Sequence, residues 1–229
     1  MPLDVTGASP PEELDPYSLR IVNAFERVGP AVVHIIAYGA QGKPAGQGSG
    51  VIFTPDGYVL TNAHVVAGMT QGPSVSFGGS NGLPATVVLF DWNNDVAILY
   101  VPGLHAPPLR FAGTAARGSG AVVVGYPENG PFRAVPARVG SQWSASGPNI
   151  YKSATVTRQI YAVRATVEPG NSGGPLLAKN GRVYGVIFAA STTARDTGFA
   201  LTAGQVRPDV RRGRNATRRV STLGCPRPG

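Results

Sequence analysis

The chain has 229 residues, of which 42% are hydrophobic, so it can bury a sizeable core as one large domain or two small fused ones. Its 31 glycines and 21 prolines favour many turns and short elements, which is more typical of an all-β protein than of a helical one. No apolar run approaches the roughly 18 to 20 residues of a membrane span, and the first residues lack the basic and apolar regions of a signal peptide.

The net charge of +8 is concentrated at the C-terminus. Residues 207–229 hold seven arginines and one acid, Asp209, so this stretch carries six of the eight net positive charges. The rest of the chain is nearly balanced, so the domain itself is not expected to bind nucleic acid. The composition predicts a flexible basic C-terminal tail over 207–229 that could contact a membrane surface or a partner.

The single cysteine, Cys225, lies in this tail and cannot form an internal disulfide. No group of side chains has metal-ligand spacing, so we expect neither a metal nor a cofactor.

The N-terminal part begins with residues 1–15, which are Pro-rich and acidic and are predicted to be a disordered segment. A helix is expected over 16–28, because Asp15 can cap it, Pro16 suits its first turn and apolar residues recur on one face.

The first half of the chain then shows the β-branched and apolar runs that favour strands. Strands are predicted at residues 31–38, 50–54, 58–61, 74–77, 85–90 and 96–101. His34 lies inside the first of them and is interpreted as a satisfied structural histidine. The hairpin of 50–61 leads directly to His64. Asp95 stands before a strand that is apolar throughout, and a carboxylate there requires a donor such as a histidine N–H.

A Pro- and Gly-containing link over 102–108, which holds His105 as a surface residue, marks the boundary between the halves. In the second half, strands are predicted at residues 121–126, 132–139, 154–160, 161–167, 182–190 and 198–201. Residues 141–149 are predicted to be a polar loop.

Ser172 is enclosed by glycines between two prolines, in the run Pro169-Gly170-Asn171-Ser172-Gly173-Gly174-Pro175. Glycine lets the backbone take unusual dihedral angles and lie close to a ligand, so this loop can hold a serine outward. The amides of Gly170 and Ser172 could point into one cavity and stabilise an anionic oxygen. The alternative interpretation is an ordinary Gly-rich turn between strands.

Nucleophilic catalysis by serine requires a base, a carboxylate that orients the base, and donors for the oxyanion. The chain offers His64, Asp95 and Ser172 in the order of the chymotrypsin-like arrangement. Because the first two lie in one half and the serine in the other, the site is expected in the cleft between the halves. The competing hypothesis is a non-catalytic binding module that keeps the protease fold.

Three motifs carry a family resemblance, and the chain is similar over about residues 18–206 to trypsin-like serine proteases of the bacterial HtrA/Deg type. These motifs are Thr61-Asn62-Ala63-His64-Val65-Val66, Asn94-Asp95-Val96-Ala97-Ile98-Leu99 and Gly170-Asn171-Ser172-Gly173-Gly174-Pro175-Leu176. Shorter matches are Gly48-Ser49-Gly50-Val51-Ile52, Val124-Gly125-Tyr126-Pro127 and Thr197-Gly198-Phe199-Ala200-Leu201. The second half contains Ile150-Tyr151, Tyr161-Ala162-Val163-Arg164 and Gly198-Phe199-Ala200-Leu201-Thr202-Ala203-Gly204. With these residues it more closely resembles the actinobacterial acid-resistance proteases of the MarP type.

The resemblance implies a trypsin-like domain over 16–206 with two six-stranded antiparallel Greek-key barrels, barrel 1 at about 30–106 and barrel 2 at about 107–206. It implies a serine endopeptidase that acts on polypeptide substrates in the periplasm, the cell envelope or outside the cell, in a stress or quality-control role. The residues after 206 are too few for the PDZ domain that HtrA/Deg enzymes usually carry.

By resemblance, the primary substrate pocket is lined by Thr166 and by Phe188, Ala189 and Ala190. Since none of these is a carboxylate, a small or medium apolar side chain is expected there in place of Lys or Arg. Trypsin-type zymogens place an aspartate before the nucleophile, which pairs with a newly freed terminal amine. The neutral Asn171 cannot form that ion pair, so activity is predicted without cleavage to expose a new N-terminus.

Overall fold

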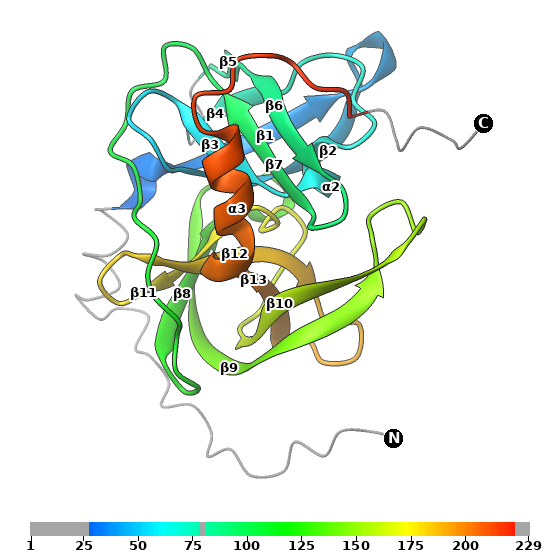
Figure 1. Ribbon diagram of the computed structural model, residues 1–229. Coiled ribbons are helices and arrows are strands. Elements are labelled where there is room, and N and C mark those ends of the chain that lie inside the picture. The colour runs from blue at the N-terminus through cyan, green and yellow to red at the C-terminus, as the bar shows by residue number, and fades with distance from the viewer. Residues whose placement is uncertain (1–27, 78–80, 223–229) are drawn as a thin grey trace.

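The computed structural model describes residues 28–77 and 81–222, which form two curled sheets joined by residues 101–119 (Figure 1). The predictions for the segment 1–15, for the helix over 16–28 except its last residue, and for Cys225 lie outside the described residues. The all-β prediction is confirmed for the part of the chain that the structure describes.

The first sheet has seven antiparallel strands within the described residues, in the spatial order β5-β4-β1-β2-β3-β7-β6. The strands are β1 Val32–Tyr38, β2 Pro44–Ile52, β3 Tyr58–Thr61, β4 Ser74–Ser76, β5 Leu83–Pro84, β6 Thr86–Asp91 and β7 Val96–Tyr100. The predicted turn between β2 and β3 depends on Gly57, whose φ is +92°, because a Cβ there would lie 2.4 Å from the carbonyl oxygen of Val101. The extra strand beyond the expected six is the two-residue β5.

The second sheet closes into a barrel with the order β10-β13-β12-β11-β8-β9 among the described residues. Its strands are β8 Gly120–Gly125, β9 Arg133–Pro148, β10 Thr155–Arg164, β11 Pro175–Ala178, β12 Val183–Ala190 and β13 Thr197–Thr202. Three local predictions are wrong: β9 continues through the expected polar loop at 141–149, β10 is one strand where two were expected, and β11 was not expected. The end of β9 pairs with β10 as a largely exposed hairpin, so this part of the strand needs no apolar alternation.

Helices are few in the described part of the chain, and the longest follows the last strand. They are the 3-10 helices η1 Gly29–Ala31, η2 Ala40–Gly42 and η3 Pro127–Asn129 and the α-helices α2 Ala63–Val66 and α3 Ala203–Gly213. Thr202 caps α3, since its hydroxyl oxygen accepts a hydrogen bond from the amide of Gln205 at 3.1 Å.

Helix α3 leaves the second barrel and packs on the first sheet, where a Cβ on Gly213 would lie 2.6 Å from Ile98 of β7. The chain then continues along the same sheet: the amide of Val220 donates to Val87 at 2.9 Å, and the buried Thr222 accepts from the amide of Gly68 at 2.8 Å. The structure therefore corrects the expectation of a flexible tail for residues 207–222, which pack against the domain.

Three buried clusters form the core, and one of them joins the two halves. It combines Leu60 and Ile98 of the first sheet with Val124 and Leu201 of the barrel and Val206 of α3. The other two clusters fill the first sheet and the barrel separately. The shared cluster fixes the two sheets against each other, and the candidate site lies along their boundary.

Candidate active site

His64 and Asp95 meet at the edge of the first sheet, although 31 positions separate them. Nδ1 of His64 lies 2.8 Å from Oδ2 of Asp95, and the His64 amide donates to Oδ1 at 2.9 Å. The His64 side chain is 37% exposed and that of Asp95 is 5% exposed. Because a carboxylate only accepts, the hydrogen resides on Nδ1, and Nε2 is left as the basic nitrogen.

The backbone of Asp95 takes an uncommon conformation that its neighbours hold in place. Its φ is +58°, in the left-handed region that Asp and Asn tolerate better than most residues. The side chain of Asn62, which has no exposed surface, donates from Nδ2 to the Asp95 carbonyl oxygen at 2.9 Å. The carboxylate and the backbone carbonyl of Asp95 are thus both held by the segment that carries His64.

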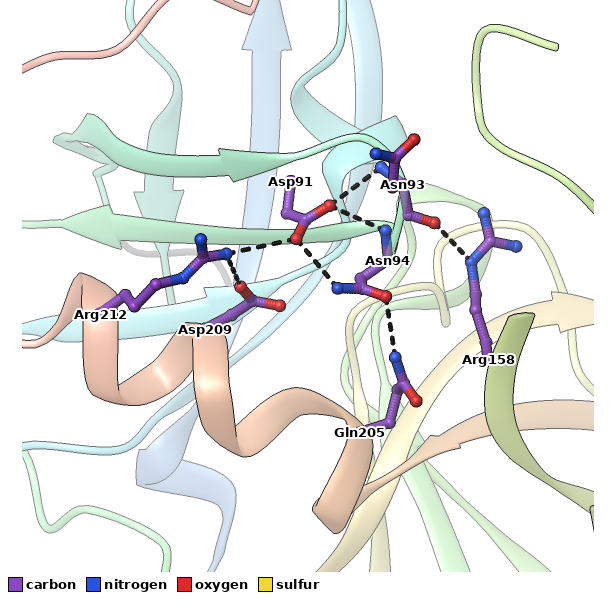
Figure 2. A network of polar contacts seen from close by, with 7 residues as sticks. All are labelled: Asp91, Asn93, Asn94, Arg158, Gln205, Asp209 and Arg212. Atoms are coloured by element: carbon purple, nitrogen blue, oxygen red, sulfur yellow. Dashed lines mark hydrogen bonds and ion pairs between the residues drawn. The ribbon is translucent and has the colours of Figure 1, made fainter. Parts of the chain in front are cut away.

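The turn before Asp95 is organised by Asp91, as Figure 2 shows. Oδ1 of Asp91 accepts from the amides of Asn93 and Asn94 at 2.9 Å, and Oδ2 accepts from Nδ2 of Asn94 at 2.9 Å. These bonds close a local turn of the kind that a short acidic side chain stabilises.

The same turn is bound to the second half of the chain by polar side chains (Figure 2). Nε2 of Gln205 on α3 donates to Oδ1 of Asn94 at 2.8 Å, and Nε of Arg158 on β10 donates to the Asn93 carbonyl oxygen at 2.8 Å. Asn149 adds a bond from its Nδ2 to Oδ1 of Asn93 at 2.9 Å. We call these three contacts the inter-sheet clamp.

The Ser172 loop requires its glycines for steric reasons. Gly170 and Gly173 have φ values of +96° and +83°. A Cβ on Gly170 would lie 2.3 Å from the Tyr126 carbonyl oxygen, and one on Gly173 would lie 2.1 Å from the Ser49 carbonyl oxygen. The prediction of a tight loop with unusual backbone dihedral angles is therefore confirmed at Gly170 and Gly173.

Hydrogen bonds orient the two amides that were singled out in the sequence. The Pro169 carbonyl oxygen accepts from the Glu128 amide at 2.7 Å, and the Asn171 carbonyl oxygen accepts from the Gly174 amide at 2.9 Å. In a trans peptide the N–H points away from the C=O, so the amides of Gly170 and Ser172 point away from these partners. Within residues 28–77 and 81–222, neither amide donates to a protein acceptor.

The Ser172 loop and helix α2 both lie close to Gly48 on β2. A Cβ built on Gly48 would lie 2.6 Å from Val65, the neighbour of His64, and 2.8 Å from the Ser172 carbonyl oxygen. The Ser49 amide also donates to that oxygen at 2.7 Å. The structure thus brings the Ser172 segment to the same edge as His64 and Asp95.

The residues expected to line a substrate pocket come from two strands that lie on either side of β13: Thr166 follows β10, and the other three end β12. Thr166 and Ala190 are exposed, whereas Phe188 and Ala189 are partly buried. Ala190 pairs with Gly198 of β13, and a Cβ on Gly198 would lie 2.4 Å from Val167. The sequence interpretation did not include Val167, which contacts this pair of strands.

His34 is partly buried and its ring lies 5.2 Å from that of Tyr126, centroid to centroid. Burial lowers the pKa of His34. Its position inside β1 agrees with a structural residue, but Nε2 has no hydrogen-bond partner in the part of the chain that the structure describes.

Sequence reasoning quoted Ser49 within a motif and gave it no role. The structure places its buried side chain between the Ser172 loop and Tyr126. The available signal was its Gly48-Ser49-Gly50 context, because glycines on both sides mark close backbone approach there just as they do at Ser172.

Residues 48–186 match the family model of the trypsin-like peptidase domain. Serine protease Rv3671c of Mycobacterium tuberculosis is 44% identical over 198 residues, which is 86% of this chain and 49% of the relative. A Chlamydia pneumoniae protein named "Probable periplasmic serine endoprotease DegP-like" is 33% identical over 70% of this chain and 33% of its own length.

The crystal structure of the active form of the Rv3671c protease from M. tuberculosis matches with a TM-score of 0.84 and 41% identity, covering 98% of this chain and 99% of that one. The chain spans about half the length of the curated relative Rv3671c. The chain is thus similar to serine proteases of the HtrA and Rv3671c type, and the family match over residues 48–186 establishes that it belongs to the trypsin-like peptidase family.

Proposed function

We propose that the chain is a serine endopeptidase with His64, Asp95 and Ser172 as its catalytic triad. The observation that carries the proposal is the 2.8 Å contact between His64 and Asp95, beside a serine loop whose two amides remain available. A histidine oriented by a buried carboxylate, a serine and free amides are the parts that acyl transfer requires.

In this mechanism Oγ of Ser172 attacks the carbonyl carbon of the scissile bond, and its proton passes to Nε2 of His64. The amides of Gly170 and Ser172 bind the oxyanion of the tetrahedral intermediate. His64 then gives its proton to the leaving amine as the C–N bond breaks, which leaves an acyl-enzyme on Ser172. Water attacks this ester with His64 again as base, and the second product leaves with Oγ protonated.

A serine-directed fluorophosphonate tests the proposal. The folded wild type should be labelled on Ser172 and should cleave casein, whereas Ser172→Ala should do neither. A folded wild type that carries no label on Ser172 would overturn the triad. Labelling without cleavage of casein or of peptides would point to an esterase and overturn the endopeptidase assignment.

We further propose that the first substrate pocket accepts a small or medium apolar side chain. Thr166, Phe188, Ala189 and Ala190 provide no negative charge, and Val167 adds an apolar contact at Gly198. A peptide library with every residue at the cleaved position should yield Val, Ala or Leu in excess over Lys and Arg. An excess of Lys or Arg would contradict this pocket.

We also propose that the loop is competent without zymogen cleavage. Asn171 is 2% exposed, and its backbone N–H donates to the Glu168 carbonyl oxygen at 3.0 Å. A neutral side chain there offers no ion pair to a terminal amine. Truncations within residues 1–27 should therefore give similar kcat values, and dependence on one freshly cleaved terminus would overturn this part of the proposal.

The cellular compartment and the biological role of the chain are also proposals. The name of the DegP-like relative and the family resemblance support an extracytoplasmic stress or quality-control role. No α-helix in the described residues is long and apolar enough to cross a membrane. Localisation of a tagged full-length protein in its host, by fractionation of envelope and cytoplasm, tests the compartment.

The basic segment that begins in the last turn of α3, residues 211–222, supports contact with an anionic membrane surface. Its exposed arginines that take part in no ion pair within the described residues are Arg211, Arg214, Arg218 and Arg219. Binding to vesicles with anionic lipid should fall as salt increases and should be lost when these arginines are replaced by glutamine. Equal binding to neutral vesicles would contradict the proposal.

A further inference from the structure

Ser49 lies on β2 of the first half, with no exposed surface, between two glycines. All of its polar groups are engaged. Its hydroxyl donates to the Gly170 carbonyl oxygen at 2.7 Å and accepts from the Tyr126 amide at 2.9 Å. Its own amide donates to the Ser172 carbonyl oxygen at 2.7 Å, and its carbonyl oxygen accepts from the Thr61 hydroxyl at 2.8 Å. One residue of the first half therefore holds both ends of the Gly170–Ser172 segment.

These contacts fix the backbone conformation of Gly170, which its own local sequence does not restrict. Glycine at a φ of +96° has access to many other conformations. The peptide before Gly170 is held through the bond from the Glu128 amide to the Pro169 carbonyl oxygen. The peptide after Gly170 is held through the Ser49 hydroxyl. With both flanking peptides fixed, the direction of the Gly170 N–H is fixed as well.

The same hydroxyl links the two segments that make these bonds. Tyr126, whose amide bonds to Ser49, lies two positions before Glu128 and presents its carbonyl oxygen 2.3 Å from the Cβ position of Gly170. The Ser49 side chain thus sets the 126–128 segment and the Gly170 loop relative to each other. An alanine there would leave a buried N–H and a buried C=O without this partner, and such groups are costly inside a protein.

We propose that Ser49 is a positioning residue that locks the Gly170 loop with its amides available to the reacting carbonyl oxygen. The proposal rests on the serine endopeptidase function above and adds a requirement to it: a side chain from the first half prepares the oxyanion site of the second. The side chain of Ser49 is closely surrounded by backbone. A Cβ on Gly125 would lie 2.6 Å from Oγ of Ser49, and a Cβ on Gly174 would lie 3.3 Å from Cβ of Ser49. A branched or longer side chain would meet this backbone.

The test compares Ser49→Ala with wild type on one peptide substrate. Loss of a donor that acts only on the transition state lowers kcat, so kcat should fall about 10- to 100-fold while KM changes less than about threefold. Affinity for a peptide boronate, which places a charged oxygen in the oxyanion site, should fall with kcat. Affinity for the corresponding product peptide should remain unchanged.

Thr54→Val provides the matched control. Thr54 is also a buried residue in the β2–β3 hairpin, and its hydroxyl oxygen accepts from the Tyr58 amide at 3.1 Å. Within residues 28–77 and 81–222, this hydroxyl makes no hydrogen bond to the Ser172 loop. It should lower thermal stability and leave kcat and boronate affinity unchanged. If Ser49→Ala does not fold, Ser49→Cys keeps a weaker donor and should lower kcat with KM preserved.

The results separate the two proposals. A folded wild type without fluorophosphonate label or peptide cleavage overturns the endopeptidase function, and the Ser49 role with it. An active wild type with folded Ser49→Ala and Ser49→Cys variants of unchanged kcat overturns the Ser49 role alone. A fall in kcat that Thr54→Val reproduces would assign the effect to general stability and would also overturn it.

Discussion

Asp95 combines burial, a left-handed backbone and two bonds to His64, so its position is determined by several independent contacts. The left-handed conformation costs free energy, and it is held by Asn62 at the carbonyl end and by His64 at the carboxylate. A residue that is held so firmly is suited to orienting an imidazole, because a small displacement would separate Nδ1 from Oδ2.

Asp95→Asn preserves the shape of this side chain and replaces one acceptor oxygen by a donor. The ring of His64 would then favour the tautomer with hydrogen on Nε2, which cannot accept the serine proton. We expect kcat/KM at neutral pH to fall about 10³- to 10⁴-fold with the fold retained. Steady-state kinetics together with circular dichroism check this. A folded variant with activity within tenfold of wild type would mean that Asp95 does not orient His64.

Helix α3 carries a buried acid, Asp209, which is 1% exposed. Burial raises the pKa of Asp209, and the bond from Arg212 offsets only part of this effect because Arg212 is itself largely exposed. The neighbouring Asp91 also raises the pKa of Asp209. Conversely, the ion pair with Asp209 raises the pKa of Arg212. Both pKa shifts arise at the contact between Asp209 and Arg212, and for the buried Asp209 the effect of desolvation is the larger one.

The pH dependence of stability follows from that direction. A carboxyl with a raised pKa in the folded state binds its proton more tightly there, so its contribution is complete at low pH and is lost as pH rises through the folded pKa. Asp209→Asn cannot ionise. The free energy of unfolding of the variant minus that of wild type should therefore increase from acidic to neutral pH, as measured by urea denaturation at constant ionic strength.

Asp196→Asn is the control with the opposite sign. Its hydrogen bond with Arg164 lowers the pKa of Asp196, so its stabilising contribution is present above the ordinary pKa and is lost as pH falls. The free energy of unfolding of Asp196→Asn minus that of wild type should therefore decrease or stay nearly level from acidic to neutral pH. The change should be small because the Asp196–Arg164 pair is exposed and screened by solvent. An Asp209→Asn difference that fell with pH would show that the ion pair outweighs burial.

At the scale of the whole molecule, the candidate site depends on the registration of the two halves. The shared core cluster provides the apolar contact, and the inter-sheet clamp binds the turn before Asp95 to α3 and β10 (Figure 2). Apolar packing is not directional, whereas hydrogen bonds fix orientation. The clamp is therefore suited to positioning Asp95 once the core has brought the halves together.

Gln205→Ala removes the clamp contact on α3. It also removes the acceptor of the Gln159 amide. The lost bond to Asn94, at about 1 kcal/mol, is the one that bears on the turn before Asp95, so we expect kcat to fall about three- to tenfold with little change in KM. Gln205→Glu loses the Nε2 donor to Asn94 and keeps the acceptor for the Gln159 amide, and it should behave like the alanine variant. A lower thermal midpoint with unchanged kcat in both variants would limit Gln205 to a structural role.

Local patterns in the sequence predicted most of the strands, and they also singled out the three candidate catalytic residues. The β-branched and apolar runs predicted β1, β7, β8 and β12 to within one or two residues, because a buried strand must carry apolar side chains. The exposed half of β9 escaped prediction, since a hairpin surrounded by solvent has no such requirement. The basic composition suggested a flexible tail, although Val206, Val210 and Gly213 bury one face of α3.

By itself the sequence determined that His64, Asp95 and Ser172 stand at strand ends and in a glycine loop, because those signals lie within a few neighbouring residues. Only the tertiary structure decided that Ser49 holds Gly170, 121 positions away, and that Gln205 holds Asn94, 111 positions away. A serine or glutamine can bond to any polar group that comes within reach, so its partner is set by the packing of the two halves and leaves no local pattern in the chain.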